Sequence, residues 1–443
     1  MEKREEFLGH PKGLFVCFLT ELWERFSFYG MRAILVLYMI GKIDAINPGL
    51  GWSKGFALGM YGWYTMAGYL ISLPGGWIAD RFLGQKKTVL IGGFLLCIGH
   101  CLLAFDSVHT FAIGVTFIIF GVGGLKPNIA TMVGGLYPAG DPRRDAAFTI
   151  FYMGINIGAL LATLLVGFIG ETFGWHYGFG LAGIGMLIGQ AVFFFGRHHL
   201  KGVGDFVPPT QDKVQFGHHA PLTKIEKDRM IVLSLVFILQ FIFFAAFEQA
   251  GGLMTIYTSE KVDRMLFGME VPASIFQAAN PLFIILFGTL VATYWLNRKK
   301  AGKQASSIYK IALGTILTGL GFLLMDGAVL QADAVGKAAA VWIIGAYFLH
   351  TIGELCVSPV CMSFTTKLAP AKYASLMMGF CFVSVGFGNK VAGMLGAFSE
   401  QVGEKAIFTG LVVFCVFFGL VLLLFKRKLT ILSHGADDDR IEA

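Results

Sequence analysis

The feature that most constrains this chain is a set of ionisable residues inside its first long apolar segment. Four of them interrupt that segment: Glu21, Glu24, Arg25 and Arg32. A charge at membrane depth costs about 2.5–3.5 kcal/mol even on a lenient insertion scale, so it is kept only where it has a task. At about 100° per residue, these four and Tyr29 fall within an arc of about 140° on one helix face. The segment is therefore predicted to form one wall of a buried polar path.

Composition indicates that the bilayer is part of the solvent of this protein. Of the 443 residues, 56% are hydrophobic and only 14% are charged, and a soluble fold of this length cannot bury so much apolar surface. Apolar runs long enough to cross a bilayer form two sets. The first set lies at 13–42, 53–79, 88–106, 110–131, 146–171 and 176–196, and the second at 228–258, 274–296, 306–326, 337–362, 373–398 and 406–425.

These runs predict an all-α integral membrane protein with twelve transmembrane helices in two six-helix bundles. We expect an N-terminal bundle at 1–196, a polar cytoplasmic linker at 197–227, and a C-terminal bundle with a short cytoplasmic tail at 228–443. Two six-helix repeats with a substrate site between them are a common transporter design.

The distribution of basic residues predicts the orientation in the membrane. With the N-terminus inside, most of the 35 Lys and Arg fall on the inner side. Among them are Arg81, Lys86, Lys87, Arg143, Arg144, Arg298, Lys299, Lys300, Lys303, Lys426, Arg427 and Lys428. This asymmetry predicts that both termini are cytoplasmic. It also explains the net charge of +7 without nucleic-acid binding.

Charged residues inside the spans match one another by depth. Counted at about 1.5 Å per residue, Arg32 and Glu248 lie in the outer half of the membrane, whereas Lys126 and Glu354 lie in the inner half. Each depth then has one acid and one base from opposite halves of the chain, and pairing lowers the cost of a buried charge. We expect two gates, Arg32–Glu248 outside and Lys126–Glu354 inside. Neighbouring Gly and Pro residues favour gates that open, although pairs that only staple the bundle remain the alternative.

Polar side chains are expected to complete a central cavity. They are Tyr29, Tyr64, Tyr69, Asn156, Gln277, Asn280 and Ser384. The Asn280-Pro281 step is expected to interrupt the eighth span and to free backbone groups that a water-lined cavity can satisfy. For Asn156 and Asn280 substrate contact is the favoured interpretation, whereas for Tyr64 an ordinary interhelical hydrogen bond fits at least as well.

Several motifs resemble the proton-dependent oligopeptide transporter family of the major facilitator superfamily. The segment from Glu21 to Gly30 is similar to the family signature ExxERFxYYG, and 353–359, GELCVSP, is similar to GELxxSP. Segments 151–158 and 277–281 fit family segments, and 80–86 resembles the superfamily loop DRxGxK/R. The likeness runs from about residue 10 to about residue 425.

The resemblance implies import of di- and tripeptides together with protons. It implies that Arg32 and Lys126 hold the peptide carboxylate and that Glu354 faces the peptide ammonium. It further implies that Asn156 and Asn280 bond the peptide backbone and that Tyr69 lines the site. Proton coupling is implied for the cluster of Glu21, Glu24 and Arg25. Protons are the expected coupling ion, with no cofactor, metal site or catalytic residue. A monomer in the bacterial inner membrane is expected.

Three departures from the family pattern bear on these expectations. Phe28 stands where the family usually has a tyrosine, and Cys381 stands where a tryptophan is common, so we expect an altered peptide preference and more space near Cys381. The linker 197–227 is too short to hold the two extra helices of many bacterial members, which favours twelve helices.

Peptide import has two alternatives. A proton-coupled carrier of another small anion, such as nitrate, is the nearest alternative, but the acid at Glu354 argues against a purely anionic substrate. A membrane-embedded enzyme fits poorly, because no Ser/His pair, His/Glu metal pattern or phosphate-binding glycine loop occurs at plausible membrane depth.

Overall fold

The computed structural model describes residues 5–138, 141, 143–206, 222–266, 268–303, 305–370 and 373–436. Contacts divide the chain into two compact units, which are described separately. The first unit contains Met1–Ser53, Ala67–Thr210 and Pro272–Pro281, and the second contains Lys54–Met66, Gln211–Val271 and Leu282–Ala443. Fifteen residues of the predicted linker, 207–221, and the end of the predicted tail, 437–443, lie outside the described residues.

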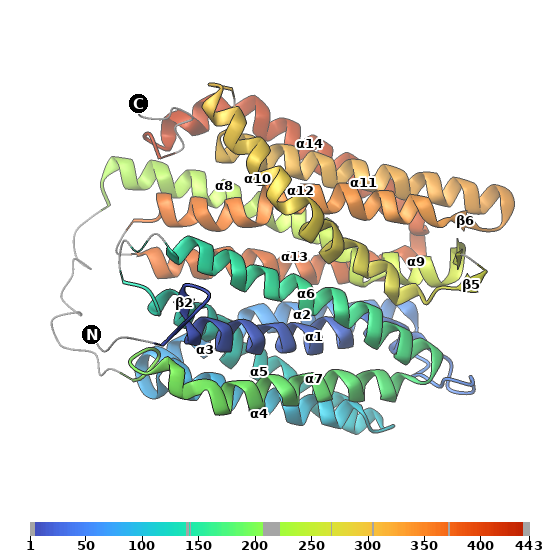
Figure 1. The fold of residues 1–443 in the computed structure, drawn as a ribbon. Helices are drawn as coiled ribbons and strands as arrows, with labels where there is room; N and C mark the ends of the chain where they lie inside the picture. Colours follow the sequence, from blue (N-terminus) through green and yellow to red (C-terminus); the bar gives the residue numbers. More distant parts are fainter. Residues whose placement is uncertain are drawn as a thin grey trace. The chain divides into compact units, whose positions relative to one another are not determined.

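The first unit is built from long helices that pack side by side (Figure 1). Its helices are α1 (Lys12–Ile40), α3 (Ser72–Ile78), a π-helix η1 (Ala79–Leu83), α4 (Gln85–Leu103), α5 (Val108–Gly135), α6 (Arg143–Thr172), α7 (Trp175–Gly196), and the 3-10 helices η2 (Arg197–Leu200) and η5 (Ala273–Ala278). A short antiparallel hairpin of β1 (Glu6–Phe7) and β2 (His10–Pro11) precedes α1. Helix α1 packs on α6 and α7, and α4 packs on α5 and α7.

The second unit is also helical. It contains α8 (Lys224–Phe247), the 3-10 helix η4 (Glu248–Gly251), α9 (Leu253–Lys261), most of α10 (Ala279–Lys300), α11 (Ser307–Val335), α12 (Ala340–Leu368), α13 (Ala374–Val402) and α14 (Glu404–Leu432). Helix α2 (Lys54–Leu70) begins in this unit and ends in the first. Two-residue strands pair β3 (Val262–Asp263) with β6 (Ala338–Ala339) and β4 (Met265–Leu266) with β5 (Met269–Glu270). Helix α11 packs on α12 and α14, and α8 packs on α13.

The prediction of an all-helical membrane protein is confirmed. Within the described residues, ten helical segments are long and apolar enough to cross a membrane. Helix α1 is not among the ten although it has 29 residues, because its charged face lowers its hydropathy.

Three predicted spans contain breaks, of which only the one beside Pro281 was expected from the sequence. The span predicted at 53–79 divides after Leu70 into α2 and α3, and the one predicted at 228–258 divides into α8, η4 and α9. In the span predicted at 274–296, the 3-10 helix η5 changes to α10 at Ala279, so Pro281 lies in the first turn of α10. A proline is tolerated there because the first N–H groups of a helix have no intrahelical partner. The expected interruption therefore lies at the start of α10.

Close contact between α4 and α5 depends on glycine. A Cβ atom added to Gly92 would lie 2.8 Å from the Gly121 carbonyl oxygen, and one added to Gly121 would lie 2.8 Å from the Gly92 carbonyl oxygen. Neither backbone oxygen can move out of the way without displacing its helix. Small residues let helix backbones approach inside a membrane, where lipid tails remove the hydrophobic drive for association.

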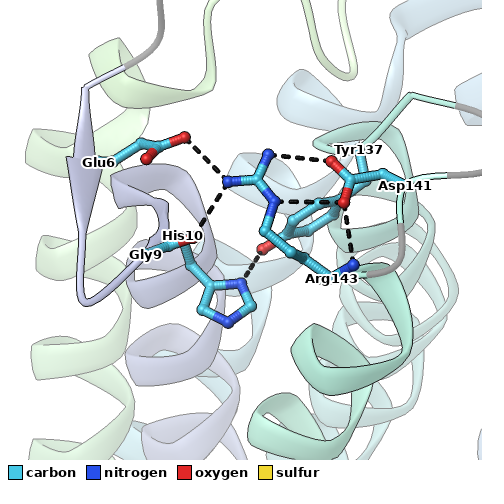
Figure 2. Close-up of polar contacts among 6 residues, drawn as sticks. All are labelled: Glu6, Gly9, His10, Tyr137, Asp141 and Arg143. Atoms are coloured by element: carbon cyan, nitrogen blue, oxygen red, sulfur yellow. Dashed lines mark hydrogen bonds and ion pairs between the residues drawn. The ribbon is translucent and has the colours of Figure 1, made fainter.

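A polar cluster fastens the β1–β2 hairpin to the segment that joins α5 and α6 (Figure 2). The Arg143 guanidinium donates to Glu6 Oε1 at 3.0 Å, to the Gly9 carbonyl at 3.1 Å and to Asp141 Oδ2 at 2.9 Å. A hydrogen bond of 2.7 Å joins His10 Nδ1 and the Tyr137 hydroxyl. Burial raises the pKa of Tyr137 to about 12, so this phenol stays protonated at neutral pH.

Candidate functional site in the membrane-spanning helices

The charged face of α1 forms a compact buried cluster in the first unit. Arg25 Nε lies 2.7 Å from Glu21 Oε1 and 3.0 Å from Glu24 Oε2. The exposed fractions of Glu21, Glu24 and Arg25 are only 2%, 1% and 5%. One guanidinium thus serves two carboxylates, and with both carboxylates ionised the trio carries a net charge of −1. A second positive charge or a proton is needed to neutralise it.

Glycine in α6 brings that helix close to the cluster. A Cβ atom on Gly158 would lie 2.2 Å from the Leu22 carbonyl oxygen, so a larger residue would push α6 away from α1. Asn156 lies on the same part of α6 and is 4% exposed. Its Nδ2 donates to the Tyr152 carbonyl at 2.9 Å.

Two further predicted cations of the first unit stack on tyrosines that were also predicted for the site. Lys126 Nζ lies 4.1 Å from the centre of the Tyr69 ring, and Arg32 Cζ lies 5.6 Å from the centre of the Tyr29 ring. Lys126 also interacts electrostatically with Glu24. The negative face of an aromatic ring stabilises a cation in a place with little water. Lys126 thus carries a positive charge whose attraction reaches Glu24 in the α1 cluster.

Gln277 on η5 and Asn280 in the first turn of α10 belong to the first unit, although they come from the second half of the sequence. Gln277 Nε2 donates to the Ala33 carbonyl on α1 at 3.2 Å. The Glu171 carboxylate at the end of α6 accepts from the Ala273 and Ser274 N–H groups, at 3.0 and 2.7 Å. Sequence reasoning missed this role of Glu171, because no local pattern links two segments 102 residues apart.

Glu248 opens the 3-10 helix η4 in the second unit. Its Oε1 accepts a hydrogen bond of 2.6 Å from the Tyr61 hydroxyl on α2, and the side chain is 6% exposed. The next residue, Gln249, donates from Nε2 to the Ala392 carbonyl on α13 at 3.0 Å. Sequence reasoning did not identify Tyr61. Depth in the membrane was the signal that could have found it, because Tyr61 lies in the outer part of its predicted span, as Glu248 does.

The other predicted residues of the second unit lie on α12 and α13. Glu354 is half-buried on α12. Ser384 Oγ donates to the Cys381 carbonyl at 2.8 Å within α13. The Cys381 thiol is fully buried and donates to Gln240 Oε1 on α8 at 3.3 Å, so a hydrogen bond holds the side chain that replaces the usual tryptophan. Tyr64 is also buried in this unit.

The two predicted gates each combine residues of both units. Arg32 and Lys126 belong to the first unit, and Glu248 and Glu354 belong to the second. Because each unit is described by itself, both pairings stay predictions.

Comparison with known sequences identifies the family. A sequence model of the POT family matches residues 86–216 and 210–410. An uncharacterized transporter of Bacillus subtilis is 36% identical over 94% of each chain. A protein named di-/tripeptide transporter from Lactococcus lactis subsp. lactis is 32% identical over 96% of each chain. A protein named peptide transporter from Yersinia enterocolitica is 33% identical over 88% of each chain.

Comparison with solved structures agrees with this result. A crystal structure of a peptide transporter POT in complex with sulfate superposes with a TM-score of 0.90 at 33% identity, covering 97% of both chains. A POT family transporter in complex with 5-aminolevulinic acid gives a TM-score of 0.88 at 32% identity, covering 96% of this chain and 98% of the other.

Proposed function

Because the chain belongs to the POT family, whose members are transporters and not enzymes, we propose that it imports di- and tripeptides together with protons by alternating access. Relatives that cover nearly the whole chain are named di-/tripeptide transporters. The observation that carries the proposal is the buried trio in which Arg25 lies within 3.0 Å of two carboxylates, since it can take up and release a proton inside the membrane.

The proposed architecture has twelve spans in two six-helix bundles, at 1–196 and 228–443, joined by a linker at 197–227. In the part of the chain that the structure describes, ten helical segments are long and apolar enough to cross a membrane. Helix α1, with 29 residues, reaches about 43 Å at 1.5 Å per residue and supplies an eleventh span. Helices α2 and α3 together supply the twelfth. The linker sequence at 197–227 is too short for two additional spans of about 20 residues each.

The proposed location is the bacterial inner membrane, with both termini in the cytoplasm. The ends of α10 and α14 carry Arg298, Lys299, Lys300, Lys426, Arg427 and Lys428. These residues favour the cytoplasmic side, as expected from the positive-inside rule. The protein is proposed to act as a monomer.

Proton coupling is assigned to Glu21, Glu24 and Arg25. A proton bound by Glu24 would neutralise the trio and leave Arg25 paired with Glu21 alone. It would also remove the attraction between Glu24 and Lys126 and so favour binding of Lys126 to substrate or to Glu354. Each proton that moves inward gains about 2.3 kcal/mol per 100 mV of membrane potential. The proton is the coupling ion, and the mechanism uses no cofactor.

Peptide binding is assigned to a cavity with one basic and one acidic end. Arg32 and Lys126 would hold the carboxylate of the peptide and Glu354 its ammonium group. The remaining contacts would come from Tyr29, Tyr69, Asn156, Asn280 and Ser384. A grip on the two charged ends ignores the side chains of the peptide, which suits a broad importer. The same charges would form the gates, Arg32 with Glu248 outside and Lys126 with Glu354 inside.

Uptake by the purified protein in liposomes tests this function. Labelled dialanine should accumulate when the liposome exterior is acidic and the interior negative, and unlabelled di- and tripeptides should compete with it. Nitrate, free alanine and sugars serve as the control competitors. Competition by nitrate with no effect of peptides would favour the anion carrier, and uptake that ignores the proton gradient would exclude proton coupling.

A further inference from the structure

An apolar hollow of about 270 Å³ lies at the exposed side of helices α10, α11 and α12 in the second unit. Its lining is aliphatic and aromatic: Leu290, Val291, Tyr294, Trp295, Leu313, Leu317, Ile352 and Cys356. Two of these side chains, Leu290 and Tyr294, are 62% and 52% exposed. The hollow is therefore open to the hydrocarbon that surrounds a membrane-spanning helix, and an acyl chain is the matching occupant.

Three cations surround the aromatic end of this hollow. Arg298 Cζ lies 5.7 Å from the ring centre of Tyr294 and 6.0 Å from that of Trp295, and Lys310 Nζ lies 5.4 Å from that of Trp295. Lys426 Nζ lies 5.3 Å from the ring centre of Tyr309. The end of α10, the beginning of α11 and the last part of α14 thus meet at one place (Figure 1).

Unlike the basic residues at an ordinary helix end, these three cations each contact an aromatic ring of Tyr294, Trp295 or Tyr309. Arg298 Nη1 donates to the Tyr294 hydroxyl at 3.1 Å. The rings of Tyr294 and Trp295 are 5.2 Å apart, and those of Trp295 and Tyr309 are 6.1 Å apart. All three cations are half-buried. The N-terminus of α11 adds the positive end of a helix dipole.

We propose that the hollow and this cluster form a binding site for one anionic glycerophospholipid of the cytoplasmic leaflet. An acyl chain would fill the hollow, and the phosphate would lie among Arg298, Lys310 and Lys426. Basic pockets between transmembrane helices on the cytoplasmic side suit anionic head groups. The choice of leaflet rests on the proposed orientation, whereas the site itself is independent of the transported substrate.

The first test measures lipid retention by native mass spectrometry. The full-length protein is purified in detergent with equal amounts of phosphatidylglycerol and phosphatidylethanolamine, and the wild type should retain phosphatidylglycerol preferentially. The triple variant R298Q/K310Q/K426Q should bind it about 100-fold more weakly, because each basic side chain near the surface contributes about fivefold. The matched control K299Q/K300Q/K303Q removes the same number of charges from the end of α10 and the residues just after it, outside the cluster, and should keep the preference.

The second test fills the hollow and leaves the cations in place. Val291→Trp should lose retained phosphatidylglycerol, and Leu290→Trp at the exposed rim serves the same purpose if the first variant does not fold, as judged by its unfolding temperature. Equal retention of the two lipids by the wild type would overturn the proposal. So would an equal loss in the two triple variants, full binding by a folded filled-hollow variant, or displacement of the lipid by millimolar inorganic phosphate.

Discussion

Replacing Glu24 with glutamine separates proton coupling from peptide movement. The substitution keeps the size of the side chain and removes its charge, so it imitates a permanently protonated Glu24. Arg25 keeps its partner Glu21 at 2.7 Å, and the trio changes from a net charge of −1 to neutrality. No buried cation loses its last partner, so the variant avoids the large cost of an unpaired buried charge and is expected to fold.

The driving force sets the size of the effect. With one proton per peptide, an interior at −100 mV and a pH difference of one unit, the gradient supplies about 3.7 kcal/mol, which supports about 500-fold accumulation. The Glu24→Gln variant should reach about equal concentrations inside and outside, a loss of about 500-fold. Exchange of external labelled dialanine for internal unlabelled peptide needs no net proton movement and should continue.

The assay compares two measurements on the same liposomes: accumulation under the gradient and exchange without it. Glu260→Gln is the matched control, because it makes the same change at an exposed carboxylate paired with Lys54 outside the charged trio. Accumulation by Glu24→Gln at the level of this control would refute the coupling role of the trio. Loss of exchange together with accumulation would show that Glu24 serves peptide binding instead.

Three more outcomes are expected. Lys126→Ala should abolish dialanine uptake while leaving the unfolding temperature near that of the wild type, and normal uptake would remove this lysine from the site. Gly121→Ala should destabilise the protein by about 1–3 kcal/mol because its Cβ would meet a backbone oxygen, whereas Gly410→Ala, with open space around it, should not lower the thermal unfolding temperature. A hydrogen bond from Arg143 lowers the pKa of the Asp141 carboxyl below its ordinary 3.8, so its stabilising contribution is complete above about pH 4 and disappears as pH falls through the lowered pKa. Unfolding temperatures measured at pH 6 and at pH 2.5 should therefore differ more in the wild type than in Asp141→Asn, and equal differences would contradict this account.

Local patterns predicted the helical class and the charged face of α1 well. Apolar length identifies most spans because a bilayer imposes a minimum run of residues. The spacing of Glu21, Glu24 and Arg25 predicts a shared face because a helix advances about 100° per residue, and the structure brings these three into contact.

Breaks and long-range contacts could not be predicted in the same way. The change from α8 to η4 at Glu248 and the division after Leu70 depend on packing partners that an apolar run does not encode. The bond from Tyr61 to Glu248 joins residues 187 positions apart. The capping of η5 by Glu171 likewise depends on the tertiary fold. Sequence reasoning could match such residues by depth, but it could not choose a partner among several at one depth.

The charged face of α1 also constrains the order in which the protein can be assembled. Four ionisable residues make this helix a poor candidate for insertion by itself, at about 2.5–3.5 kcal/mol for each charge near the membrane centre. Its main packing partners are α6 and α7, which the ribosome makes more than a hundred residues later. Because α1 is synthesised before these partners, its buried charges can gain their packing contacts only after α6 and α7 have been made.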